Sequence, residues 1–244
     1  MNRLIVYVIM VFSLISCEKE EPETFSTHLE GDLRIQSSAD LDDPQIRSYE
    51  TITGNLVIVD TYDTDDLKKL QKLKEVNGII IKDNQSLKTL EGLEQIESLE
   101  FLEIENNPAL RSLSGLENLQ EISESLRIVN NDSLEGLGSL KKLTTIGNQF
   151  FLYDNFSLTN LNGLESLEGV TQLLILNNIN LININSLENL SSSLDVRIDS
   201  NDSLNNFCGI LNLMQADNPA MYFIARNNLY NPSLEDLKNG DCQL

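Results

Sequence analysis

The stretch "NNDSLEGLGSLKKLTTIG", residues 130–147, has an apolar residue at every third position from Leu134 to Ile146. An α-helix turns about 100° per residue, so steps of three would spread these side chains around roughly 240° of its surface. A β-strand has a period of two and would not bury them together either. The stretch therefore favours short extended pieces joined by corners, each of which turns one side chain into a common core.

An asparagine slot recurs along the rest of the chain. It comes three residues after an aliphatic residue, and most of its intervals are 23 or 24 residues. The slot is held by Ser38, Thr61, Asn84, Asn107, Asn131, Asn155, Asn178, Asn201 and, after a longer interval, Asn227. Periods of 20 to 50 residues are typical of solenoids. We expect the asparagines from Asn84 to Asn227 to stack as a structural ladder rather than to bind a ligand.

Each period has two halves. The first alternates, as at Leu126 and Ile128, and predicts a short strand. The second repeats every three residues and carries a glycine at one shared slot, where a corner can require positive φ; these glycines are Gly92, Gly115 and Gly163. Stacked strands would form parallel sheets and bury the leucines. The sequence thus predicts a mainly β repeat solenoid with about 8–9 coils of 23–24 residues.

The line "SLEFLEIENNPALRSLSGLENLQEI", residues 98–122, resembles the receptor L-domain, a β-solenoid module related to leucine-rich repeats. The usual leucine-rich repeat has N-x-L, whereas this chain has N-x-x-L, as in "NPAL". The resemblance covers residues 31–244 and implies a right-handed solenoid. Residues 31–53, with Pro44 and few leucines, are expected to form an N-terminal cap.

Cys208 and Cys242 form an even pair in the exported part of the chain, where they would be either a disulfide or two buried thiols. Residues 203–210 ("SLNNFCGI") and 227–244 also resemble the closing segment of L-domain-like bacterial surface proteins. That resemblance implies a disulfide in a C-terminal cap over residues 205–244.

The N-terminus carries one cation, Arg3, and then a mostly apolar run that is too short to span a membrane. It is typical of a signal peptide, residues 1–16. The "LISC" at 14–17 resembles a bacterial lipobox, which implies lipid attachment at Cys17. Residues 17–30 are acidic and predict a flexible tether. They resemble the export signal of Bacteroidota surface lipoproteins, which implies an outer-membrane protein facing outward. A periplasm-facing protein and an ordinary secreted protein are the alternatives.

The formal net charge of −21 argues against nucleic acid as a partner and leaves the lipid anchor as the expected membrane contact. Only one histidine, His28, is present, so a catalytic triad or a zinc site built from several histidines and cysteines is not expected. The carboxylates of "DTYDTDD", Asp60 to Asp66, could bind Ca²⁺ weakly, but a solvated corner explains them as well. We expect no enzyme activity, no cofactor and no resident metal.

If Leu126 and Ile128 point inward, their neighbours on the strand point outward. Stacking then gathers a candidate binding face made of Arg127, Val129, Phe151, Tyr153, Leu174, Leu176, Arg197 and Asp199. Apolar patches with polar rims mark interaction sites. In the receptor family the corresponding face contributes to hormone binding. A crossing loop, or simple β-propensity, would explain the pattern without function. We predict a surface binding or adhesion protein for a protein or glycan ligand; the alternative is an assembly subunit of an envelope complex.

Overall fold

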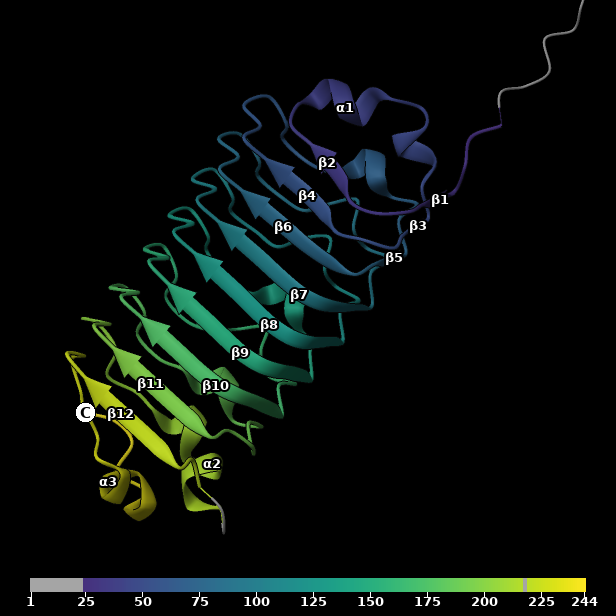
Figure 1. Ribbon diagram of the computed structural model, residues 1–244. Coiled ribbons are helices and arrows are strands. Elements are labelled where there is room, and N and C mark those ends of the chain that lie inside the picture. The colour runs from purple at the N-terminus through teal and green to yellow at the C-terminus, as the bar shows by residue number, and fades with distance from the viewer. Residues whose placement is uncertain (1–23, 217–218) are drawn as a thin grey trace, which may run out of the picture.

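The computed structural model describes residues 24–216 and 219–244. The predicted signal peptide (1–16), Cys17 and the tether as far as residue 23 lie outside the described residues. Within them the protein is mainly β, with most of its strands side by side in one long sheet (Figure 1). No helix in these two ranges is long and apolar enough to cross a membrane.

The large sheet has nine strands, and each of them pairs in parallel with its neighbours. In sheet order they are β12 (Tyr222–Arg226), β11 (Asp195–Asp199), β10 (Gly169–Leu176), β9 (Thr145–Tyr153), β8 (Glu121–Val129), β7 (Ser98–Glu105), β6 (Gly78–Lys82), β4 (Leu56–Val59) and β2 (Leu33–Ile35). Paired residues from β2 to β11 are 23 or 24 positions apart; Ile104, for example, pairs with Ile128. The mainly β, parallel-sheet prediction is confirmed.

A second, three-stranded parallel sheet lies at the N-terminal end and consists of β1 (His28–Leu29), β3 (Thr51–Ile52) and β5 (Glu75–Val76). The end of the predicted tether is therefore placed wrongly, because His28 and Leu29 are already a strand. The carbonyl of Thr27 accepts hydrogen bonds from the backbone N–H groups of Glu50 and Thr51. These backbone partners fix the segment even though its sequence is polar.

The period-three leucines all point into the core, where Leu134, Leu137, Leu140 and Leu143 have no exposed surface. They do so partly through tight turns rather than extended pieces alone. Leu140 N–H donates to the Leu137 carbonyl at 2.9 Å, and Leu143 N–H to that of Leu140 at 3.0 Å. A 3₁₀-helix has 3.0 residues per turn, so residues three apart share a side. Such turns are η1 (Ile46–Ser48), η2 (Lys68–Leu70), η3 (Gly138–Leu140), η4 (Asn185–Leu187) and η5 (Cys208–Ile210).

The shared glycine slot requires the left-handed region, as the spacing predicted. Gly92, Gly115 and Gly163 have φ values of 118°, 113° and 113°. A Cβ atom added at Gly115 would lie 2.0 Å from the carbonyl oxygen of Leu90 in the preceding period. Glycine is therefore needed both for the backbone conformation and for the close approach of two chain segments.

The asparagine slot forms a continuous buried hydrogen-bond ladder. The backbone N–H and side-chain Nδ2 of Asn107 both donate to Asn131 Oδ1, at 3.2 and 3.1 Å. Asn131 Nδ2 also donates to the carbonyls of Ile104 and Val129, both at 3.0 Å. Thr61 begins the ladder by donating to Asn84. Each rung therefore joins neighbouring periods and satisfies backbone groups that are out of reach of water.

The predicted ladder is wrong at its last member. Asn201 donates to Asn228 Oδ1 from its backbone and side chain, at 3.0 and 3.1 Å, and not to Asn227. Asn227 is exposed and has a φ of 53°. The physical reason is the longer connection before β12. Asn201 and Asn228 are 27 residues apart, one more than the interval to Asn227 read from the sequence, so the last strand is shifted by one residue.

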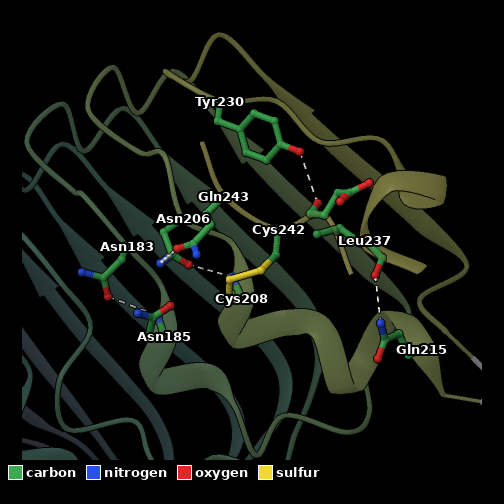
Figure 2. Close-up of a disulfide and its surroundings, with 10 residues drawn as sticks. Asn183, Asn185, Asn206, Cys208, Gln215, Tyr230, Leu237, Cys242 and Gln243 are labelled. Carbon is green, nitrogen blue, oxygen red and sulfur yellow. Dashed lines mark hydrogen bonds between the residues drawn. A yellow bond between two sulfur atoms is a disulfide. The ribbon is translucent and has the colours of Figure 1, made fainter. Parts of the chain in front are cut away.

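Short helices lie at the two ends of the large sheet (Figure 1): α1 (Ser38–Asp42) at the β2 end, and α2 (Leu211–Gln215) and α3 (Leu234–Asn239) at the β12 end. The predicted disulfide is confirmed, because Cys208 in η5 is bonded to Cys242 after α3. Figure 2 shows this bond and the nearby hydrogen bond from Gln215 to the Leu237 carbonyl, which joins α2 to α3. The last segment of the chain is thus tied covalently to the end of the core.

Candidate binding face

The eight residues predicted for the binding face lie side by side on the outer side of β8, β9, β10 and β11. The strand register pairs Arg127 with Phe151, then Leu174, then Arg197. Two residues further along each strand, the register pairs Val129 with Tyr153, then Leu176, then Asp199. The residues between the two rows, such as Ile128 and Leu152, are fully buried on the other side of the sheet. The two rows are therefore neighbours on one surface.

The centre of this face is an aromatic cluster. The guanidinium carbon of Arg127 lies 4.5 Å from the centroid of the Phe151 ring, close enough for a cation–π contact. The Phe151 and Tyr153 rings are 5.8 Å apart and tilted by 40°. Val129 is only 6% exposed and offers little contact area, contrary to the prediction that it belongs to the open face. The accessible centre therefore consists of partly exposed aromatic and leucine side chains.

Charged residues on the face, and beside it on β6 and β7, form ion pairs. Arg197 donates two hydrogen bonds to Asp195, at 3.0 and 2.8 Å. Lys82 contacts Glu105 at 2.7 Å, and this hydrogen bond raises the pKa of Lys82. Since cations and carboxylates alternate here, the face is close to electrically balanced, although the chain as a whole carries a net charge of −21.

Asp199 occupies the end of the second row and has three hydrogen-bond donors. Arg226 Nε donates to one carboxylate oxygen at 2.5 Å. Ser200 Oγ and Asn227 Nδ2 donate to the other, both at 2.9 Å. Burial alone would raise the pKa of Asp199, but these three hydrogen bonds outweigh it and hold the pKa below its usual value. Asp199 is therefore an ionised and fixed group at neutral pH.

The last strand presents different residues from those read off the sequence. Ile224 pairs with Arg197 and Arg226 pairs with Asp199, so these two point outward with Tyr222. Phe223 and Ala225 pack against the core. Placing Asn227 in the asparagine slot, as the sequence spacing did, would instead have put these two side chains on the outer side. Tyr222 is 61% and Ile224 42% exposed, so the apolar surface continues to the edge of the sheet.

Sequence reasoning missed one outer row. On each strand it lies two residues before the row that contains Arg127. It consists of Gly78, Phe101, Ser125, Gln149, Gln172, Asp195 and Tyr222. Phe101 lies over Gly78, where an added Cβ would be 2.4 Å from its ring. Extending the alternation of each strand by one step toward its N-terminus would have found this row.

A rim borders the face where the strands end. Every rim residue is in the left-handed region, with φ between 53° and 60°: Asp60, Asp83, Asn106, Asn130, Asp154, Asn177, Ser200 and Asn227. Asn and Asp tolerate this conformation better than other side chains with a Cβ. Several rim side chains bond to each other, as Asn130 Nδ2 does to Asn106 Oδ1 at 2.8 Å. The signal was visible in the sequence as the polar residue before each ladder position.

Residues of the rim and of the second row line a shallow, open depression of about 390 Å³: Tyr153, Leu176, Asn177, Asp199 and Ser200. Its volume lies in the range of roughly 300–1,000 Å³ found for small-molecule sites. The lining combines one aromatic ring, one aliphatic side chain and three polar groups, which is suited to holding a ligand that has both an apolar surface and hydroxyl groups.

Three of the four carboxylates of the candidate calcium loop have separate partners. Asp63 accepts from the backbone and the side chain of Ser38, at 3.0 and 2.7 Å, and the side-chain bond lowers its pKa the most. Asp65 pairs with Lys88, and Asp66 with Lys68, both at 2.9 Å. Across residues 24–216 and 219–244, no three His, Cys, Asp or Glu side chains cluster as a metal site would require.

His28 Nδ1 lies 2.6 Å from Thr51 Oγ1, and the ring is exposed beside Glu30. The bond links β1 to β3, which gives the chain's only histidine a structural partner.

No protein-family model matches the chain, and no curated protein is similar to it. Any assignment of function therefore depends on the chain's own residues.

Proposed function

We propose that the protein is a lipid-anchored binding or adhesion protein of the cell envelope, which contacts a protein or glycan through the outer face of β8 to β12. The observation that carries this proposal is the partly exposed cluster of Phe151, Tyr153, Leu174 and Leu176, surrounded by paired charges. Aromatic residues flanked by arginine dominate many binding surfaces. A sheet face that served only solubility on so acidic a chain would carry charged and small polar residues instead.

We also propose the finer architecture: a right-handed β-solenoid of the receptor L-domain and leucine-rich-repeat type, with about 8–9 coils. The 23- or 24-residue register and the continuous asparagine ladder support it. A stack of similar coils has a flat, extended sheet face, which is the kind of surface that solenoid proteins use for binding.

The lipid anchor at Cys17 and the outward orientation are supported by the sequence of residues 1–30 alone. We assign the chain no catalytic role and no cofactor, since its single histidine bonds Thr51 and the carboxylates of Asp63, Asp65 and Asp66 each have a separate partner. In this proposal the lipid anchor contacts the membrane, and the strand face binds the partner.

The binding face is tested with Phe151→Asp and Leu174→Asp. Both side chains are on the outer surface, so the variants should keep the wild-type circular dichroism and remain folded at the assay temperature. Each should lose capture of ligands from cell-surface extracts, because a charge replaces a desolvated apolar contact. Tyr62→Asp, at a tyrosine that is 72% exposed away from the face, is the matched control and should bind normally. Unchanged capture by both face variants would show that another surface binds.

The orientation is tested by adding protease to intact cells, with lysed cells as the control. We expect cleavage in both, because an outward-facing domain is accessible without lysis. Protection in intact cells would place the domain in the periplasm and favour the assembly-subunit alternative.

A further inference from the structure

We propose that the depression between Tyr153 and Ser200 is a binding subsite for a neutral saccharide. This inference rests on the proposed function, because it names the class of ligand for one part of the same face. It is carried by the composition of the lining, by the hydrogen bonds that this lining already makes, and by the charge around it.

Tyr153 supplies a rigid stacking surface. Its ring packs against Phe151, whose ring lies under the Arg127 guanidinium, so the three side chains hold each other in place. Leu176 is its neighbour on β10 in the strand register. A pyranose ring has one face made of C–H groups, and a fixed aromatic ring beside an aliphatic side chain is the complementary surface for it.

The polar part of the lining is rich in unused acceptors. Asn177 Nδ2 donates to Asp154 Oδ1. Within the described ranges, Asn177 Oδ1 accepts no hydrogen bond. Ser200 Oγ donates its hydrogen bond to Asp199, so its lone pairs remain available as acceptors. Asp199 accepts three bonds, one fewer than its roughly four lone-pair sites. A ligand that donates several hydrogen bonds is therefore favoured, and sugar hydroxyls do so.

Charge argues for a neutral ligand. The nearby carboxylate of Asp199 is already matched by Arg226, so a cationic side chain would gain little there. No cation is among the residues lining the depression, and the Asp199 carboxylate in that lining repels phosphate, sulfate and carboxylate groups. Amines and acidic sugars are both disfavoured, which leaves a polyhydroxylated neutral ring.

The test is binding of the whole protein, in neutral detergent, to an array of neutral glycans with gluco, manno, galacto and xylo configurations. Chondroitin sulfate and polygalacturonate are the anionic comparison. We expect at least one neutral glycan to bind and the anionic ones not to. Tyr153→Ala should raise the dissociation constant at least about tenfold, and Tyr153→Phe, which keeps the ring, should change it much less. Asn177→Gly, compatible with the positive φ, should also weaken binding.

Tyr62→Ala is the matched control, since it removes an exposed tyrosine elsewhere and should leave glycan binding unchanged. Absence of binding to the whole neutral set, equal binding by Tyr153→Ala, or preference for the anionic glycans would each overturn the saccharide inference. If glycans fail while Phe151→Asp and Leu174→Asp still abolish protein capture, the proposed function stands with a protein ligand. If those variants also bind normally, both proposals fail.

Discussion

At the scale of single residues, the asparagine ladder shows how one side chain can serve several parts of the fold. Asn131 accepts from the backbone and side chain of Asn107 and donates to Asn155 and to two carbonyls, all out of contact with water. The adjacent Asn130 is exposed and makes one side-chain bond, to Asn106. Two identical residue types side by side therefore have very different structural importance.

Asn131→Ala should lower the free energy of unfolding by about 3 kcal/mol or more, because each buried group left without a partner costs about 1–3 kcal/mol. Urea denaturation followed by circular dichroism measures this. Asn130→Gly is the control: glycine accepts the positive φ, and the loss should stay within about 1 kcal/mol. Similar losses in the two variants would contradict a structural role confined to the buried column.

At the scale of elements, the run between strands is defined by tight turns and by a close glycine contact. Each i→i+3 hydrogen bond brings the next leucine onto the same side, as in Leu116 to Leu113 and Leu119 to Leu116, both at 3.1 Å. Gly115 sits where this run touches the preceding period. The element is therefore stable only when it is stacked against its neighbour.

Gly115→Ala should destabilise the protein by about 2 kcal/mol or more, since φ is 113° and the new Cβ would meet a carbonyl oxygen at 2.0 Å. Gly136→Ala is a matched change two positions after Leu134, with nothing within 4 Å of the added Cβ. It should be neutral or stabilise by up to about 1 kcal/mol. Thermal unfolding of the two variants, measured side by side, distinguishes an effect of the Gly115 position from a general effect of replacing glycine by alanine.

At the scale of the whole molecule, the sheet must end without leaving its core open. The chain closes the β12 end with α2, α3 and the Cys208–Cys242 bond, and Tyr230 packs edge-on against Phe207. In a stack, each unit is stabilised by its neighbours, so loss of a terminal cap weakens the end first.

Replacing both cysteines by alanine should lower the free energy of unfolding by about 3–4 kcal/mol, from the closure of a loop of about 35 residues. Guanidinium denaturation with and without a reductant measures the effect. Reductant should destabilise the wild type to a similar extent and leave the alanine variant unchanged, which is the internal control. A wild type that is insensitive to complete reduction would contradict the cap's role.

The sequence by itself determined the period, the inward and outward sides of the strands from β8 to β11, and the glycine corners. These features are local, because each depends on residue types at spacings of two, three or 23–24 along the chain. The two outward rows from β8 to β11 follow from that spacing without further information.

Only the tertiary structure decided the shift of β12, the burial of Val129 and the depression at Tyr153 and Asp199. β12 pairs with β11 at an interval of 27 residues, as at Asp195 and Tyr222, and the 23- or 24-residue repeat does not encode that interval. The depression joins side chains from three successive strands, and its polar groups are fixed by bonds from Arg226 and Asn227. Such contacts arise from parallel stacking of segments distant in the chain, so they exist only once the sheet is assembled.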